Sequence, residues 1–299
     1  MTCNLEPVTN MHAIAEKRIK SRQKRTFMKT KFLIVMLCIA FLSCNKKQDD
    51  FSSSNNSNNS HVKFKTADGF EFDELGEVHN DALVYVGNHT DLLELTAQER
   101  FEYSNTYTDD YSSNNLSWAA LYDELSISKE AADASLTSDT DPFEILNNED
   151  LLQTNMEDFT DRLSGIFNDA YNESNGTIIS SSAFTSLIED LEDYVVNNYT
   201  VSYNSTTQRG NAAACMLATC AVAKYSYNFW YAALNDQYNN WYPILQEGSN
   251  PAARSIKAAA ADAYAFIFKG WIDTDGNGTR ETWDSGYAVE VARAWSASA

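Results

Sequence analysis

Basic residues, cysteine and histidine are all scarce in this 299-residue chain. It holds 22 Lys and Arg against 42 Asp and Glu, a formal net charge of −20, with five cysteines and four histidines. Phosphate groups are bound mainly through Lys and Arg, so a chain this acidic is a poor candidate for binding nucleic acid or anionic lipid. The same charge favours cations as ligands and solubility at a cell surface.

A hydrophobic run long enough to cross a bilayer is also missing. The longest run, residues 32–43, is almost entirely apolar, but a spanning helix needs about 20 such residues. It follows Lys29 and Lys31, and this order of a basic segment and a short apolar core is typical of a secretory signal peptide. We therefore predict that residues 1–43 are a signal peptide whose true start is Met28.

The run ends in "FLSC", which resembles the lipobox of bacterial lipoproteins, with Phe41 in place of the usual Leu. The resemblance implies cleavage before Cys44 and diacylation of that residue; the alternative is a signal peptide that is cut elsewhere. The next residues, "NKKQDD", resemble the surface-export signal of Bacteroidetes lipoproteins. The Ser/Asn tract at residues 52–60 offers no apolar group to bury, so residues 44–61 are predicted to be a lipid-anchored flexible tether.

Proline and glycine are scarce too, with four and eleven residues, and no second low-complexity stretch follows the tether. We therefore predict that residues 62–299 form a single domain. Its cysteines, Cys215 and Cys220, are five residues apart, which on a helix leaves them about 140° apart and unable to bridge each other. We expect buried free thiols, because a disulfide would require the helix to begin after Cys215.

Apolar residues recur at the three-and-four spacing of helices over most of this domain, which predicts an all-α, multi-helix bundle. Thr96 and Glu99 form a capping box, and Asp141 with Pro142 and Glu144 opens another helix. Strand signals are confined to short pieces such as "HVKFKT" and "YTVSY". The predicted helices cover residues 74–87, 95–101, 140–171, 182–199, 212–245 and 251–271.

The helix at 212–245 differs from the others. "AAACMLATCAVA" is apolar all round, which is typical of a helix surrounded by other helices. The rest, "KYSYNFWYAALNDQYNNWY", is rich in Tyr and Trp. Such a row can pack in the core and at its rim, or it can serve as a platform on which sugar rings stack. The sequence leaves both interpretations open.

The segment "WIDTDGNGTRETWD" resembles a calcium-binding EF-hand loop, with dockerin-like features. Counted from Asp273, oxygen ligands fall at the positions that calcium requires and Gly278 falls at the sharp turn. The predicted calcium ligands are Asp273, Asp275, Asn277, Thr279, Glu281 and Asp284. The resemblance implies a helix-loop-helix over residues 252–299 that holds a structural Ca²⁺.

Three departures from the EF-hand pattern keep another interpretation open. The twelfth position is Asp284 instead of Glu, the eighth is Arg280 instead of an apolar residue, and no second loop is visible to form a pair. An Asp/Asn/Gly-rich turn that binds no metal is the alternative.

Catalytic motifs are missing around His61, His79 and His89: none lies in an HExxH, a GxSxG or a glycine-rich phosphate loop. "GEVHNDAL", which contains His79 and Asn80, resembles a Gly-x-x-His-Asn-x-x-Leu element near the start of uncharacterised Bacteroidetes lipoproteins and secreted proteins. That resemblance implies a compartment and no activity. A histidine and asparagine beside an apolar helix face more often make a structural polar contact than a catalytic site.

These patterns together predict a lipid-anchored protein of the cell envelope, an outer-membrane lipoprotein, and they leave open whether it is exposed at the cell surface. Its expected role is binding or structural, with a glycan or a protein as ligand and Ca²⁺ as a structural ion. The competing interpretation is a hydrolase that acts on extracellular glycan or peptide and uses the aromatic segment as its platform. No catalytic residue is assigned for it.

Overall fold

The computed structural model describes residues 64–67, 69–89, 91–107, 118–137, 140–148, 153, 155–276 and 279–298. All of them belong to one compact unit, Ser60–Ala299. Helices hold 68% of the described residues, so the prediction of a helix-dominated fold is confirmed. Two small antiparallel sheets accompany them, which the all-α prediction did not include. The signal peptide, Cys44 and the tether lie outside the described residues.

Each helix carries an apolar stripe or is apolar all round, and the side chains of these stripes form one continuous core. The helices, including the 3₁₀ turn η2, are α2 (Asp73–Gly87), η2 (Leu92–Glu94), α3 (Ala97–Tyr107), α4 (Trp118–Thr137), α5 (Pro142–Asn148), α6 (Glu157–Ala170), α7 (Ser181–Asn198), α8 (Ala212–Asn235), α9 (Tyr242–Leu245), α10 (Pro251–Phe268) and α11 (Ser285–Ser298).

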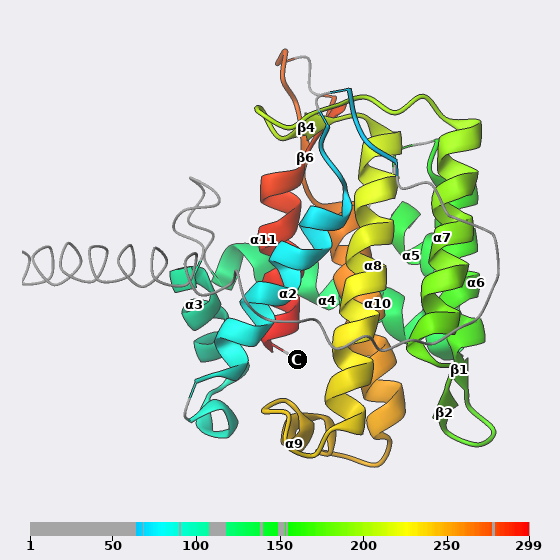
Figure 1. The fold of residues 1–299 in the computed structure, drawn as a ribbon. Helices are drawn as coiled ribbons and strands as arrows, with labels where there is room; N and C mark the ends of the chain where they lie inside the picture. The colour runs from blue at the N-terminus through cyan, green and yellow to red at the C-terminus, as the bar shows by residue number, and fades with distance from the viewer. Residues whose placement is uncertain are drawn as a thin grey trace, which may run out of the picture. The chain divides into compact units, whose positions relative to one another are not determined.

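Helix α8 lies in the middle of the bundle, between α2, α7 and α10 (Figure 1). Its first half is buried on all sides, as the continuous apolar sequence predicts. Cys215 and Cys220 lie in this half, buried and free, and burial raises the pKa of both thiols. The prediction of buried free thiols is therefore confirmed. No helix in the described part of the chain is long and apolar enough to cross a membrane.

The larger sheet has the order β3-β4-β6-β5 and joins two hairpins at one end of the bundle (Figure 1). Its strands are β3 (Tyr203–Asn204), β4 (Arg209–Gly210), β5 (Trp271–Ile272) and β6 (Thr282–Asp284). Gly210 pairs with Trp283, and a Cβ at Gly210 would lie 2.6 Å from the Ala214 Cβ. Only glycine lets this strand approach the start of α8 so closely. Strands β1 (Tyr171–Asn172) and β2 (Thr177–Ile178) form a separate hairpin between α6 and α7.

The observed helices differ from the sequence prediction in several respects. The helix expected over residues 140–171 is divided into α5 and α6. The helix expected over 212–245 ends at Asn235, because the Asp236 and Asn239 side chains accept backbone N–H groups and stabilise turns instead. Helix α4 was not predicted. The helices expected at 74–87, 182–199 and 251–271 are present as α2, α7 and α10.

Candidate functional site

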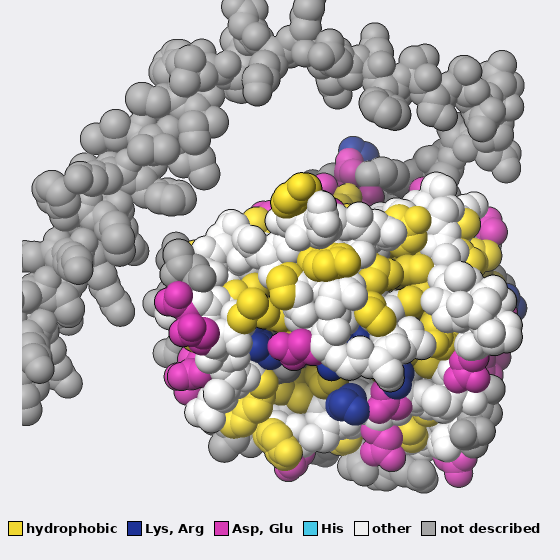
Figure 2. All heavy atoms as spheres, turned by 90° about the horizontal axis from the view of Figure 1, so that it is seen from below, with side chains coloured by type: hydrophobic (Ala, Val, Ile, Leu, Met, Phe, Trp, Pro, Cys, Tyr) yellow, Lys and Arg dark blue, Asp and Glu magenta, His cyan; other side chains and the backbone are white. Residues whose placement is uncertain are grey.

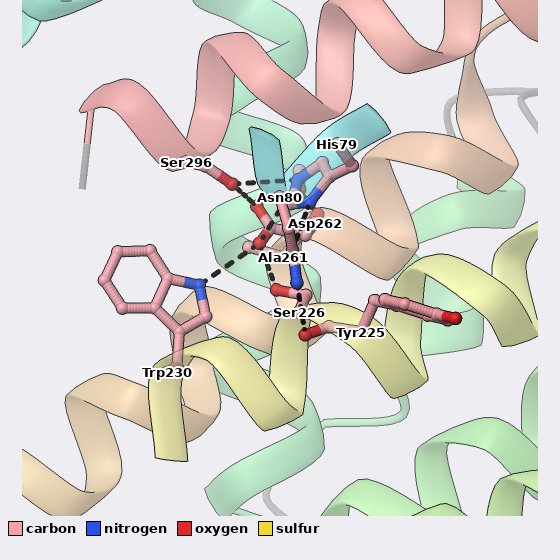
Figure 3. Close-up of polar contacts among 9 residues, drawn as sticks. His79, Asn80, Tyr225, Ser226, Trp230, Ala261, Asp262 and Ser296 are labelled. Atoms are coloured by element: carbon pink, nitrogen blue, oxygen red, sulfur yellow. Dashed lines mark hydrogen bonds and ion pairs between the residues drawn. The ribbon is translucent and has the colours of Figure 1, made fainter. Parts of the chain in front are cut away.

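A buried polar network joins four helices around the Asp262 carboxylate (Figure 3). Hydroxyl groups of Ser226 from α8 and Ser296 from α11 donate to it. The Trp230 indole Nε1 donates from 3.3 Å, and the His79 ring Nε2 of α2 lies 3.6 Å away. The Asp262, His79, Ser226 and Ser296 side chains are all fully buried. A buried carboxylate needs this number of donors, because it has lost its hydration.

Both ring nitrogens of His79 have hydrogen-bond partners. Its Nδ1 lies 3.1 Å from the Asn80 Oδ1, which can only accept, because the Asn80 amide nitrogen donates to the Tyr225 carbonyl. Its Nε2 lies 3.1 Å from the Ser296 Oγ, whose hydrogen already goes to Asp262. Both ring nitrogens are therefore engaged within the described core, and Nε2 lies 3.6 Å from the Asp262 carboxylate.

The residues Ser296, His79 and Asp262 do not form a nucleophile relay. Such a relay needs one ring nitrogen of the histidine on the serine and the other on the carboxylate. Here Ser296 and Asp262 both lie on the Nε2 side, and Nδ1 faces Asn80. Because all three side chains are buried, a substrate has no access to them, and the network acts as a structural contact.

The four defining residues of the "GEVHNDAL" element all serve the packing of α2. A Cβ at Gly76 would lie 2.6 Å from the Tyr225 ring and 2.8 Å from the Ala221 carbonyl oxygen, so Gly76 permits the close approach of α8. His79 and Asn80 make the contacts described above, and Leu83 is fully buried. The structural interpretation of this histidine and asparagine therefore agrees with the geometry, since they hold α2 against α8 and α11.

The predicted calcium ligands lie in and around the hairpin of β5 and β6. The Asp273 Oδ1 accepts the backbone N–H groups of Asp275, at 3.3 Å, and of Gly276, at 2.7 Å. The Asp284 Oδ1 accepts the Tyr287 N–H and caps α11. Thr279 and Glu281 lie between this turn and β6, whereas Asn277 and Gly278 lie outside the described residues.

An EF-hand is not shown by this arrangement. The strands flanking the loop pair with each other, Trp271 with Trp283 and Ile272 with Thr282. One oxygen of Asp284 serves as a helix cap, and within the described ranges no three acidic, His or Cys side chains converge on one point. The residues fit a calcium site only in part, and calcium binding stays a prediction.

The aromatic row of α8 and the turn after it lies in the core and at its rim. Tyr227, Trp230 and Trp241 are at most 2% exposed. The Tyr227 ring stacks on Phe184 at a centroid distance of 3.8 Å, and the Trp241 indole donates to the Leu83 carbonyl. The sequence left open whether these rings pack in the core or form a platform for sugars. The structure places Tyr227, Trp230 and Trp241 in the core.

A different part of the surface forms a groove, which we name the α4–α10 groove. It has a volume of about 690 Å³, within the usual range for ligand sites. Its walls are α4, the loop of residues 247–250 and the first turns of α10, with Trp295 of α11 at one side. The face of the bundle where α10 begins shows dark-blue and magenta side chains beside a hollow with a hydrophobic floor (Figure 2).

Aromatic and basic side chains line the α4–α10 groove together. Trp118 and Tyr122 of α4 have ring centroids 6.1 Å apart with their planes at 57°, and the Tyr122 side chain is 56% exposed. Arg254 donates to the Ile244 carbonyl at 2.5 Å, and its Nη1 lies 3.9 Å from the Glu247 carboxylate. This contact holds the loop that leads into α10 against the groove.

Asp133 of α4 binds two lysines, Lys129 on its own helix and Lys257 across the groove on α10. The Lys257 Nζ lies 2.9 Å from one of its oxygens and the Lys129 Nζ lies 2.9 Å from the other. Partial burial raises the pKa of Asp133, but the hydrogen bonds and charges of Lys257 and Lys129 outweigh it, so the pKa lies below the ordinary aspartate value. The carboxylate is therefore ionised at neutral pH and fixes both ammonium groups.

Sequence reasoning missed the α4–α10 groove because its residues come from three separated segments. One local signal was available. Trp118, Tyr122, Ser126, Lys129 and Asp133 follow the spacing of a single helix face. That pattern places aromatic rings on a helix face where an exposed helix usually carries small or charged residues.

The predicted lipidation residue, Cys44, lies outside the described residues, so its anchoring role stays a prediction.

Comparisons with protein-family models, with curated proteins and with solved structures found no match for the chain.

Proposed function

We propose that the protein is a lipid-anchored envelope protein whose helical domain binds a small polar ligand in the α4–α10 groove. The groove itself carries the proposal, because it combines a ligand-sized volume with exposed rings and fixed charges. The lipobox-like "FLSC" and the Ser/Asn tether support attachment through Cys44 to the outer membrane, with the domain at the cell surface. Binding is the proposed role, and no chemical step is assigned.

A structural Ca²⁺ is a secondary part of this proposal. The oxygen-rich spacing from Asp273 to Asp284 supports it, as does the position of the loop at the base of α11. A bound cation would relieve the repulsion among the carboxylates of the loop and stabilise the hairpin. The Asp284 cap is the observation that weighs against a complete set of ligands.

The binding role is tested by filling the α4–α10 groove. Ser126 is exposed and lines the groove, so Ser126→Trp places an indole in it without disturbing the core. Ser186→Trp is the matched control, because Ser186 is an exposed residue on α7 outside the groove. The full chain in detergent micelles is applied to arrays of oligosaccharides and peptides.

We expect the wild-type chain and Ser186→Trp to bind the same array members, and Ser126→Trp to lose them. Array members that Ser126→Trp still binds as well as the wild type would contradict the α4–α10 groove as the site. A wild-type chain that binds no array member would contradict the binding role.

A further inference from the structure

The charge of the α4–α10 groove is opposite to that of the chain. The groove is lined by three cationic side chains and two carboxylates: Lys129, Arg254 and Lys257 against Asp133 and Glu247. In the whole chain, by contrast, acidic residues outnumber basic residues by 42 to 22. Among the described residues, Asp133 accepts one hydrogen from each lysine. An ammonium has three donors, so two per lysine remain for a ligand. The groove therefore offers hydrogen-bond donors and excess positive charge to an anion.

The rings of the α4–α10 groove restrict the shape of that anion. Trp118 and Tyr122 are tilted by 57° and do not form a parallel slot for a single flat base. Tyr122 is 56% exposed, and Trp118, half-buried beside Phe101, lines the groove next to it. The C–H groups of a puckered pyranose can pack against the electron-rich surface of these rings. The groove also carries the Ser126 and Ser249 side chains, whose hydroxyls can bond to sugar hydroxyls.

We propose that the α4–α10 groove binds a saccharide that bears carboxylates, of the uronic-acid class. The sugar rings pack on Trp118 and Tyr122, and a ring carboxylate accepts hydrogen bonds from Lys129 and Lys257. This inference rests on the proposed function, because it names the ligand class of the same groove. A neutral sugar would leave the lysine donors unused, and a simple inorganic anion would leave the rings unused.

Calorimetric titration of the full chain in detergent micelles tests the inference. The probes are short fragments of polygalacturonate, alginate and hyaluronan, each compared with its carboxyl methyl ester, which keeps the sugar and removes the charge. We expect at least one acidic series to bind, its ester to bind about tenfold more weakly, and added salt to weaken binding of the acid.

Substitutions locate the binding. Lys257→Gln and Tyr122→Ala should each weaken it about tenfold. The matched controls are Lys65→Gln, an exposed lysine that pairs with Glu71, and Tyr238→Ala, whose side chain is 85% exposed; neither lines the groove. Both controls should bind as the wild type does.

Three outcomes would overturn the inference: an ester that binds as tightly as its acid, an acid whose affinity Lys257→Gln leaves unchanged, or no binding in any of the three series. If an ester or another array member binds and Ser126→Trp abolishes it, the α4–α10 groove stands as the site and only the ligand class is wrong. If an acid binds equally to Ser126→Trp, the groove itself is wrong.

Discussion

At the scale of single residues, Asp262 is a fully buried acidic side chain that depends on its hydrogen-bond partners. Its charge is balanced by two hydroxyls, one indole and the His79 ring, all buried. We predict that Asp262→Asn lowers the free energy of unfolding by about 1–3 kcal/mol, because the amide has one oxygen in place of two and leaves a buried donor unpaired. Urea denaturation measures the change. Glu71→Gln, at an exposed ion pair with Lys65, should cost less than about 1 kcal/mol, and an equal loss in both variants would contradict the assignment.

Asp133 gives a second prediction at this scale, in its pH dependence. Its folded-state pKa is lowered, so its ion pairs stabilise the fold above the unfolded pKa and are lost as the pH falls through the folded pKa. Side-chain carboxyl NMR should therefore show a midpoint below the ordinary aspartate value. Lys257→Gln should raise that midpoint, because it removes one of the two cations. A wild-type midpoint at or above the ordinary value would contradict the geometry of the α4–α10 groove.

At the scale of elements, the contact between α2 and α8 depends on Gly76. Gly76→Ala improves helix propensity by about 1 kcal/mol, but its Cβ would meet the Tyr225 ring and a backbone carbonyl of α8. We predict a net loss of about 1–3 kcal/mol in urea denaturation, since the helices must separate. Gly165→Ala in α6 is the matched control, because nothing lies within 4 Å of its Cβ. It should stabilise the protein, and stabilisation by both changes would refute the close contact.

The β5–β6 hairpin loop gives the prediction for calcium. Trp271 and Trp283 at its base are buried, so we expect thermal stability to report binding better than fluorescence. With a Kd of about 0.3 mM, about 3 mM calcium should add roughly 1.4 kcal/mol and raise the Tm by about 2–4 °C.

Asp273→Asn with Asp275→Asn should abolish this rise, because the amides remove two charges while an Asn at 273 can still accept the turn's N–H groups. Magnesium should do less than calcium, since it requires tighter octahedral geometry. An unchanged Tm of the wild-type protein at several millimolar calcium would leave the loop as a turn without a metal.

At the scale of the whole molecule, the proposed attachment to the membrane depends on Cys44. Cys44→Ala should release the protein from the membrane fraction, because each buried methylene of the acyl chains contributes about 0.8 kcal/mol and no other strong anchor is proposed. Fractionation after a high-salt wash measures this. If the variant still sediments with the membranes, the lipoprotein interpretation is wrong.

The sequence alone determined the features that depend on neighbours a few residues apart. Periodic apolar stripes predicted α2, α7 and α10, and the capping box of Thr96 and Glu99 is formed, with the Thr96 N–H donating to Glu99 at 2.8 Å. The continuous apolar run of α8 predicted its burial and that of both thiols. Helix periodicity and caps act within one or two turns, so they are visible in the sequence itself.

Only the tertiary structure decided the features that join distant segments. Ser296 meets His79 across 217 residues, and the α4–α10 groove takes Trp118, Arg254 and Trp295 from three helices. The pairing of β4 with β6 likewise joins two hairpins that are separate in the chain. A residue's own neighbours do not encode such partners, because they depend on which faces the helices bury against one another.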